Sequence, residues 1–403
     1  MAEMKKAPVI RFKGFSEEWV NSALGEVAEI KSGSTPLRSN PMFYENGNIP
    51  WVKTTDLNNS FITYTEEKIT THAKARVNPP NSVLVAMYGG FNQIGRTGLL
   101  ALPAATNQAL SVLNTNENEV LALYLLTWLN AKVDFWKMLA GSSRKDPNIT
   151  GSDVSAFPIS FPKAKEQTQI GSYFQHLDKL ISLHQTKVNK LTNLKKAMLE
   201  KMFPKQGADV PEIRFKGFAG AWEEKRLGDV VECYSGGTPL VEQTEFYGGD
   251  IPFIRSAEIN SNSTELYLTE KGLKNSSAKL VKTGDILYAL YGATSGEVGR
   301  SRINGAINQA ILAIIPSANY DAEFIMQLLR KLKLKIIGTF LQGGQGNLSG
   351  AIIKDLNILF PLLSEQQKIG AYFQNLDKTI TLHQTELEKL KNLKKACLEK
   401  MFV

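Results

Sequence analysis

Cysteine and histidine are scarce in this chain of 403 residues, which contains two cysteines and four histidines. Cys233 and Cys397 are too few for a disulfide framework or a zinc site, and they suit a reducing compartment. The sequence has no Gly-x4-Gly-Lys-Ser/Thr phosphate loop, which excludes a nucleotide-driven motor in this chain. Its longest apolar stretch, near residues 120–129, is too short to span a bilayer, and no signal-peptide pattern precedes it. We therefore expect a cytoplasmic protein without membrane spans.

The sequence repeats itself at an offset of about 200 residues. Ile10-Arg-Phe-Lys-Gly-Phe15 returns unchanged as residues 213–218, and a Trp follows in both copies. The strongest match closes each copy, where much of residues 166–203 returns in residues 365–402. A fixed offset along the whole chain indicates two copies of one structural unit.

Each copy has a mixed globular part followed by a long helix. Short apolar runs between Gly and Pro predict strands at 27–31, 51–54, 82–88 and 110–113, and longer apolar segments predict helices at 120–139 and 322–341. The predicted fold class is α+β, a tandem duplication of an irregular α/β domain in which each copy ends in a long helix. The predicted domains are a first globular domain at 1–162, a first helix at 163–204, a second globular domain at 205–361 with a linker at 205–212, and a second helix at 362–403.

A heptad pattern of apolar residues runs along both closing segments. A single seam per copy has nothing to bury against in its own copy, so we expect the two helices, each about 55 Å long at 1.5 Å per residue, to form an antiparallel coiled coil. The predicted seam positions are Ile170, Phe174, Leu177, Ile181, His184, Val188 and Leu191 in the first helix, and Ile369, Phe373, Leu376, Ile380, His383, Leu387 and Leu390 in the second.

Two further features of the helices follow from this pattern. Full overlap places His184 beside His383 at the midpoint, where polar seam positions that set the register are favoured over a metal site or a pH switch. Beyond Leu191 and Leu390 the apolar phase is predicted to shift, to Leu194 and Met198 in the first helix and to Leu393 and Cys397 in the second.

The positive charge is concentrated on the helices. The chain carries a net charge of +8, of which residues 163–205 contribute +6 and residues 362–403 contribute +2, whereas residues 1–162 carry +1 and residues 206–361 carry −1. A polyanion partner fits the overall charge. Contacts by the globular domains must then come from local patches.

Matched loop residues are the candidates for contacts with nucleic acid. The Ser-Gly-x-Thr-Pro-Leu loops supply either phosphate contacts or structural turns, and both readings remain open. The polar loops 141–151 and 342–350 carry groups that hydrogen-bond base edges or phosphates, with a plain solvated loop as the alternative. The candidate residues are Thr35, Lys53, Arg96, Ser143, Arg144, Lys145, Asn148, Thr238, Arg255, Arg300, Arg302, Gln342, Gln345 and Asn347.

Asn78-Pro79-Pro80-Asn81 is similar to the Asn-Pro-Pro-aromatic loop of amino-methyltransferases, in which the aromatic residue stacks on a flipped base. Here the fourth residue is Asn, no Gly-rich cofactor loop is present, and the second copy has no equivalent. We therefore interpret the segment as a turn before a strand.

Taken together, these motifs resemble the specificity subunit of Type I restriction–modification systems over nearly the whole chain. The resemblance rests on a P-x-I-R-F-x-G-F…W…L-G opening and an S-G-x-T-P loop in both copies. Each copy closes with F-P…E-Q-x-x-I-G-x-Y-F-x-x-L-D and an L-x-x-L-K-K-x-x-L-x-K-M-F tail. Each motif is weak alone, but their duplication in this order is specific.

The resemblance implies a subunit without catalytic activity, in which each globular domain reads one half of a split, asymmetric target in double-stranded DNA and the helices fix the spacing. It implies two methyltransferase subunits that modify adenine with S-adenosylmethionine, and two restriction subunits that use ATP and Mg where the complex cleaves DNA. No cofactor and no metal are expected in this chain. We expect the exposed helix faces near Lys195-Lys196 and Lys394-Lys395 to be candidate docking surfaces for the methyltransferase, with a solvated face as the alternative.

Two other classes of function stay open at this stage. A stand-alone nuclease or methyltransferase needs catalytic carboxylates or a cofactor loop that the sequence does not show. A protein-interaction scaffold that uses the coiled coil without touching DNA is the third possibility.

Overall fold

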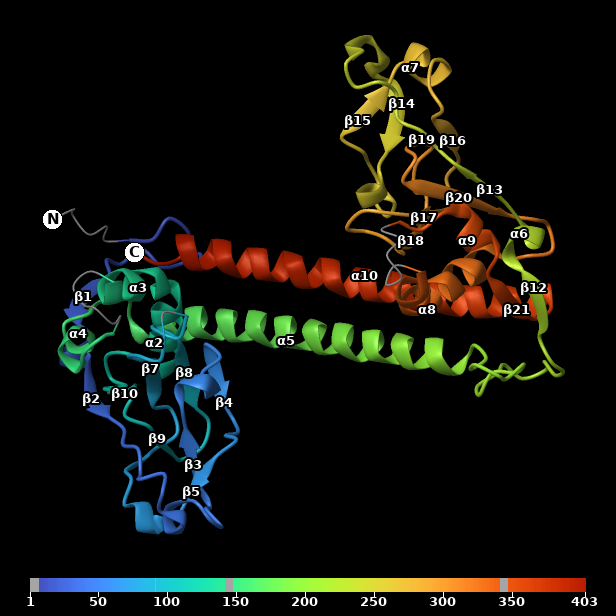
Figure 1. Cartoon of the computed structure of the whole chain (residues 1–403). Coiled ribbons are helices and arrows are strands. Elements are labelled where there is room, and N and C mark those ends of the chain that lie inside the picture. The colour runs from blue at the N-terminus through green and yellow to red at the C-terminus, as the bar shows by residue number, and fades with distance from the viewer. Residues whose placement is uncertain (1–6, 91, 142–147, 341–346) are drawn as a thin grey trace. The chain divides into compact units, whose positions relative to one another are not determined.

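The computed structural model describes residues 7–90, 92–141, 148–340 and 347–403, which form two compact units (Figure 1). Unit 1 comprises the chain up to Thr186 together with Gln384–Val403, and unit 2 comprises Lys187–His383. Each unit therefore contains one globular part, the beginning of the helix that follows it, and the end of the other long helix. None of the helices in the described ranges is long and apolar enough to cross a membrane.

Unit 1 is built around a five-stranded sheet with the order β2-β10-β7-β8-β4. A smaller sheet with the order β5-β3-β9-β6 forms its tip, and β1 pairs with β11 beside the helices (Figure 1). The strands are β1 (Val20–Ala23), β2 (Ala28–Ser32), β3 (Ile49–Val52), β4 (Ser60–Ile62), β5 (Lys68–Ile69), β6 (Val77–Asn78), β7 (Val83–Ala86), β8 (Thr97–Leu100), β9 (Ala104–Thr106), β10 (Leu110–Thr115) and β11 (Pro158–Phe161). The helices are α1 (Leu24–Val27), η1 (Pro41–Phe43), η2 (Thr54–Asp56), η3 (Thr71–Ala73), α2 (Ala122–Ala131), α3 (Val133–Gly141), α4 (Gly151–Ser155) and α5 (Ala164–Lys201).

Unit 2 repeats this plan with sheets of order β13-β20-β17-β18 and β15-β14-β19-β16, and with β12 paired to β21. Its strands are β12 (Glu223–Arg226), β13 (Val231–Ser235), β14 (Tyr247–Ile254), β15 (Leu266–Leu268), β16 (Lys279–Val281), β17 (Ile286–Ala289), β18 (Val298–Arg300), β19 (Gly305–Ile307), β20 (Ile311–Pro316) and β21 (Asn357–Phe360). Its helices are α6 (Leu227–Val230), η4 (Thr244–Phe246), η5 (Ser256–Glu258), α7 (Glu270–Lys274), α8 (Ala322–Phe340), α9 (Gly350–Lys354) and α10 (Leu363–Lys400).

The central strand β7 is apolar throughout because both faces of its sheet are covered. Val83 and Val85 point into the core shared with the helices. Leu84 and Ala86 point into a second core on the other face, which they share with Val52. The alternation of successive side chains thus explains why a continuous apolar run is a strand here rather than a helix.

The four predicted strands match β2, β3, β7 and β10 with end shifts of a few residues, but the predicted helix at 120–139 is wrong in one respect. It is divided into α2 and α3 at Lys132, whose backbone leaves the helical region with ψ 17° and whose N–H donates to Leu129. The Lys132 ammonium donates to the main-chain oxygen of Val403 at 2.7 Å. In unit 2 the equivalent helix α8 is uninterrupted.

The ends of the long helices pack antiparallel within each unit. In unit 1 the start of α5 meets the end of α10, where the Tyr173 hydroxyl lies 3.6 Å from Cys397 Sγ and Asp178 pairs with Lys394. In unit 2 the Lys195 ammonium lies 2.6 Å from Asp377 Oδ1. The partner of Asp178 lies about one helical turn beyond the residue that full overlap predicts.

The predicted seam positions are all buried or half-buried in the structure. The phase shift predicted after Leu191 and Leu390 is wrong, because Leu194 and Leu393 are 40% and 45% exposed. The heptad continues in its original phase through Lys195 and Met198 in α5 and through Lys394 and Cys397 in α10. Met202 and Met401, which directly follow the two helices, keep the same spacing and are buried. A lysine occupies a seam position here because its aliphatic stem packs while its ammonium binds an aspartate. The proximity of His184 and His383 stays a prediction.

The Ile-Arg-Phe-Lys-Gly-Phe motif is a clip that joins the two helix ends. In unit 1 the Ile10 N–H donates to Lys400 O at 2.9 Å at the end of α10, and Arg11 binds Glu166 at the start of α5 through two bonds of 2.7 Å. Glu166 is buried, with 1% of its surface exposed. Unit 2 reproduces the clip with Ile213 on Lys201 and Arg214 on Glu365.

Candidate nucleic-acid interface

One edge of the main sheet in unit 1 brings together loops that are far apart in sequence. At this edge β2 and β7 end and β8 and β10 begin. Main-chain bonds link the loops, since Ser34 N donates to Thr106 O at 2.9 Å and Asn107 N donates to Val52 O at 3.0 Å. The described end of the polar loop 141–151, residues 148–151, lies at the same edge, where Ile149 N donates to Met87 O at 2.8 Å. Thr35, Lys53, Arg96 and Asn148 therefore belong to one region.

The same edge exists in unit 2, between β13, β17, β18 and β20. Gly237 N donates to Ile307 O at 3.2 Å, and Asn308 N donates to Ile254 O at 3.3 Å. The second polar loop is anchored by the bond of 3.0 Å from Leu348 N to Leu290 O. Both copies thus assemble the Ser-Gly-x-Thr-Pro loop, the Asn-Gln-Ala loop and the end of the polar loop by the same backbone contacts.

The Ser-Gly-x-Thr-Pro loop has a structural backbone and an exposed threonine. A Cβ on Gly33 would lie 2.2 Å from Thr106 O, so only glycine fits against this strand end. Tyr44 donates to Pro36 O at 2.6 Å and fixes the turn. Thr35 and Thr238 remain exposed, and Thr238 bonds to Gln309. The loop therefore serves as a turn, and its hydroxyl is available at the surface in unit 1.

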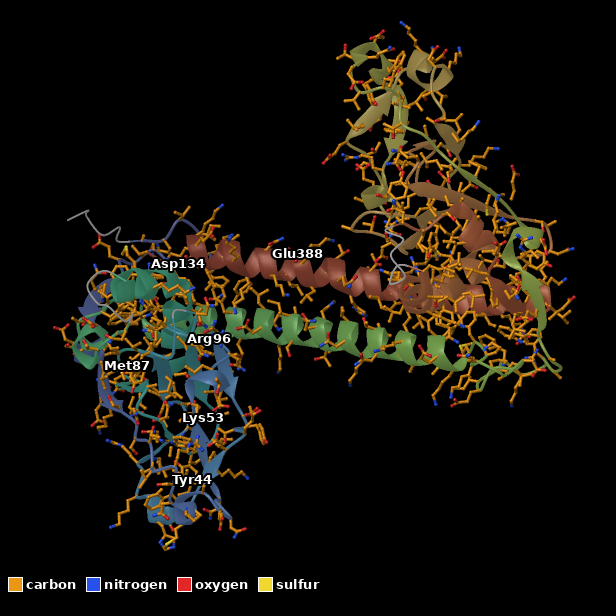
Figure 2. All side chains as sticks on the ribbon, in the orientation of Figure 1. Tyr44, Lys53, Met87, Arg96, Asp134 and Glu388 are labelled. Carbon is orange, nitrogen blue, oxygen red and sulfur yellow. The ribbon has the colours of Figure 1, made fainter. Side chains whose placement is uncertain are left out.

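The matched cations Lys53 and Arg255 are both held by carboxylates of their own unit. Lys53 Nζ lies 2.5 Å from Glu67 Oε1. Arg255 Nη2 lies 2.9 Å from Glu258 Oε1 and 2.6 Å from Glu265 Oε2. Figure 2 shows Tyr44, Lys53 and Arg96 one after another along unit 1, from its tip toward the helices.

The match of Arg96 with Arg300 expected from the sequence is wrong, because Ala86 N donates to Arg96 O in unit 1 whereas the equivalent Ala289 N donates to Glu297 O in unit 2. Arg300 pairs with Ile286 at the start of β17 and so lies at the opposite end of its sheet.

The structure gives Arg96 no side-chain hydrogen bond or ion pair among the described residues, and the side chain is half-buried. Arg300 Nε donates to Gly284 O at 2.8 Å, and its Nη1 lies 3.7 Å from the buried carboxylate of Glu323. Arg302 is exposed and donates to Asn262 Oδ1 at 2.9 Å. Of the three arginines, Arg96 lies at the sheet edge and has the greater freedom to take an external anion.

The polar loops are described only at their ends. Asn148 is half-buried and Asn347 is exposed, both next to the residues that anchor the loops to the sheet edge. The remaining loop candidates, Ser143, Arg144, Lys145, Gln342 and Gln345, lie outside the described residues.

Three buried acceptors at the edge in unit 1 were missed from the sequence. Gln93 Oε1, Thr106 Oγ1 and Asn107 Oδ1 have no hydrogen-bond partner among the described residues. An unpaired buried polar atom costs roughly 1–3 kcal/mol, which makes such a group a candidate for a bond to a ligand. The duplicated Asn-Gln-Ala triplet, which begins with Asn107, was the available signal.

Two other predicted features have a structural role. The Asn78-Pro-Pro-Asn81 segment forms the turn between β6 and β7, with Asn78 buried and donating to Ala104 O at 3.2 Å. Of the lysine pairs predicted as docking surfaces, Lys195 and Lys394 face aspartates on the other helix and are wrong candidates, whereas Lys196 and Lys395 are exposed. No group of three His, Cys, Asp or Glu side chains in the described part of the chain is placed to hold a metal ion.

Comparison with known proteins identifies this architecture. The family model for the Type I restriction modification DNA specificity domain matches residues 16–193 and 220–392. The Type I restriction enzyme MjaIX specificity subunit of Methanocaldococcus jannaschii is 26% identical over 414 residues, covering 96% of this chain and 93% of that protein. The Escherichia coli EcoR124I/EcoR124II specificity subunit is 25% identical over 178 residues, 43% of each chain. The crystal structure of a Type I system S subunit from M. genitalium has the same fold, with a TM-score of 0.70 at 16% identity over 98% of this chain and 99% of that one.

The chain has two α/β units, and each unit has an equivalent polar sheet edge and an antiparallel pair of helix ends. This arrangement is that of a recognition protein with two tandem domains. The chain belongs to the Type I restriction modification DNA specificity family. It is a DNA target-recognition subunit, the component of such systems that has no catalytic activity, and the predicted resemblance is confirmed. Membership implies DNA and the methyltransferase and restriction components as partners.

Proposed function

We propose that this chain recognises a split DNA target, that unit 1 reads one half and unit 2 the other, and that it directs a partner adenine methyltransferase to the site. The observation that carries the proposal is the duplicated sheet edge, which has the same backbone contacts but different side chains in the two units. Common backbone contacts suit a common docking geometry, and different side chains suit two different half-sites.

The partners follow from the same scheme. The two-fold repeat suits two methyltransferase subunits, with two restriction subunits added in a complex that cleaves DNA. The long helices act as a spacer that fixes the distance between half-sites. S-adenosylmethionine, ATP and Mg belong to the partners, and the complex acts in the cytoplasm.

The proposed DNA contacts are the predicted loop residues. Arg96 is the leading phosphate contact in unit 1 because it has no ion-pair partner among the described residues. Asn148 and Asn347 flank the loops proposed to reach base edges, where amide groups make paired hydrogen bonds. The globular domains proposed to carry these contacts are 1–162 and 205–361, and the helices 163–204 and 362–403 form the spacer.

Methylation mapping by long-read sequencing tests the proposal in a host that expresses this chain with its methyltransferase subunit. We expect a split motif with a fixed spacer and one modified adenine on each strand. If the complex assembles but no methylation depends on this chain, the proposal fails and a DNA-independent interaction scaffold replaces it.

A domain exchange separates the roles of the units. Replacing residues 1–162 with those of a relative should change one half of the motif and leave the other half and the spacer intact. A change in both halves contradicts the assignment of one half-site to each unit.

A further inference from the structure

A three-residue ion cluster lies on the side of unit 1 between its tip and the sheet edge. Arg38 Nη1 lies 2.6 Å from Glu67 Oε2, and Lys53 Nζ lies 2.5 Å from Glu67 Oε1. The two cations therefore converge on one anionic group, one on each oxygen. The Asp56 carboxylate accepts from Lys53 N at 2.7 Å, so two cations and two carboxylates lie here and their charges balance.

The surrounding residues hold the cluster in place. The Arg38 guanidinium lies over the rings of Tyr44 and Trp51, at 4.8 and 5.0 Å from their centroids. The main chain of Glu67 is fixed because its oxygen accepts hydrogen bonds from Trp51 N at 3.1 Å and from the Thr65 hydroxyl at 2.8 Å. A pre-positioned arginine on an aromatic face is well suited to bind a phosphate oxygen.

The cluster is open to an external anion. The Arg38 side chain is 56% exposed and that of Glu67 is 30% exposed, so a phosphate group can approach the guanidinium. The hydrogen bond from Arg38, together with the bond from Lys53, lowers the pKa of Glu67, which keeps this carboxyl charged as a competitor for the two cations. The Arg38–Glu67 pair is exposed on its arginine side, where such a pair is worth only about 0.2–1 kcal/mol, so a DNA phosphate can replace the carboxylate at Arg38.

The equivalent place in unit 2 is more negative, with Glu258 where unit 1 has Asp56. Val241 stands where unit 1 has Arg38, and Arg255 stands where unit 1 has Lys53. Arg255 is bound by both Glu258 and Glu265. One cation with two carboxylates carries a net charge of −1, which repels a phosphate.

We propose that Arg38 and Lys53 form a phosphate-binding site in which Glu67 occupies the place of a DNA phosphate until the duplex binds, and that the Arg255 cluster in unit 2 is closed to phosphate. Because Glu67 competes with the phosphate for the two cations, it weakens the binding of DNA of any sequence. The duplex displaces Glu67 where its contacts with the bases supply the free energy for this exchange. The inference rests on the proposed function, since it deepens the account of how unit 1 holds its half-site.

The test uses the complex of this chain with its methyltransferase subunit and measures duplex binding by fluorescence anisotropy at several salt concentrations. One duplex carries the mapped target and the other carries the same bases shuffled. Glu67→Gln is compared with Glu66→Gln, which removes the same charge from an exposed neighbour for which the structure gives no ion pair among the described residues. Lys53→Met is compared with Arg255→Met.

Glu67→Gln should raise the affinity for the shuffled duplex by about two- to five-fold, while Glu66→Gln changes it less, because only the first frees two cations. The logarithm of the binding constant falls with the logarithm of the salt concentration, and Lys53→Met should make this slope less steep by about 0.9, the counterion release expected for one phosphate contact. Arg255→Met should leave the slope unchanged. The slope does not depend on the fraction of folded protein, so partial unfolding does not imitate the result.

Equal effects of Glu67→Gln and Glu66→Gln, or an equal loss of slope in Arg255→Met and Lys53→Met, overturn the inference. These outcomes are distinct from failure of the proposed function. In that case the unmodified complex itself shows neither a preference for the mapped target nor methylation that depends on this chain.

Discussion

Lys195 and Asp377 form an ion pair at a seam position of the long helices, with Nζ 2.6 Å from Oδ1. Asp377 also accepts from Arg330 at 2.9 Å and from Gln327 at 3.0 Å. Their repeat equivalents Lys394 and Asp178 pair in unit 1. The two copies therefore use one charged position each to fix how the helix ends meet.

Removing the aspartate should destabilise unit 2 more than unit 1. Asp377→Asn leaves Lys195 and Arg330 close together without their anion, and we expect a loss of about 1–3 kcal/mol in the free energy of unfolding. Asp178→Asn leaves Lys394 alone and should cost less. Urea unfolding of both variants measures the difference, and equal losses contradict the proposed role of the shared carboxylate.

Loss of the buried Arg11–Glu166 ion pair should destabilise the protein more than loss of the Asp377 ion pair. Arg11→Met leaves the Glu166 carboxylate buried without its partner, which should cost about 3–5 kcal/mol. The double variant Arg11→Met/Glu166→Gln should recover part of this loss because no charge stays buried. Lys163→Met, which breaks the exposed pair with Glu17, is the control and should cost about 0–1 kcal/mol. Arg11→Met no less stable than this control would refute the argument.

Phe203 anchors the end of α5 in unit 2. Its ring lies 5.3 Å from Phe324, 5.9 Å from Phe373 and 6.1 Å from Trp222, measured between centroids. Phe203→Ala should therefore cost about 3–5 kcal/mol through the lost contacts and the cavity. Leu382→Ala, at a position 59% exposed, is the control and should change stability by less than about 0.5 kcal/mol. Thermal unfolding that does not separate the two variants contradicts this packing role.

The stability of unit 2 should depend on pH through Glu258. Burial raises the pKa of this carboxyl, but the hydrogen bonds from Arg255, Glu265 and Thr264 outweigh burial and lower it from 4.5 to about 2. A lowered pKa in the folded state adds stability that is complete above pH 4.5 and is lost as the pH falls toward 2. Glu258→Gln should thus be less stable than the unmodified protein at pH 7, and the difference should shrink below pH 4.5. Urea unfolding at pH 7, 5 and 3.5 measures it, and a difference that grows toward acid contradicts the sign.

The repeat and the heptad made most of the architecture predictable. Duplication of Ile10–Phe15 and of the closing segments requires two like units, and alternating burial explains strands such as β7. The prediction of the seam was wrong at Lys195 and Lys394, because a search for periodic apolar residues assigns lysine to the surface. Only the position of the opposing aspartates, which lie some 200 residues away in the chain, makes lysine suitable there.

The site was less predictable for the same reason. Lys53 and Arg255 are matched in sequence, yet their carboxylate partners come from unmatched positions, Glu67 in one unit and Glu265 in the other. The function of the Arg11 motif was equally hidden, because its partner Glu166 is separated from it by 155 residues. Contacts of this kind depend on how loops fold back, which local patterns do not encode.

The lysine and aspartate of each seam have a consequence for how the helices choose one another. Asp178 and Lys195 lie on one helix, and their equivalents Asp377 and Lys394 lie on the other, so either helix carries both halves of the complementary pair. The chemistry of the seam therefore does not distinguish a helix from its own copy in another molecule. The tether between the repeats makes that distinction, because it raises the effective concentration of the correct partner. The two helices of one chain therefore pair because their effective concentration is high. A high concentration of the protein should favour pairing between helices of different molecules.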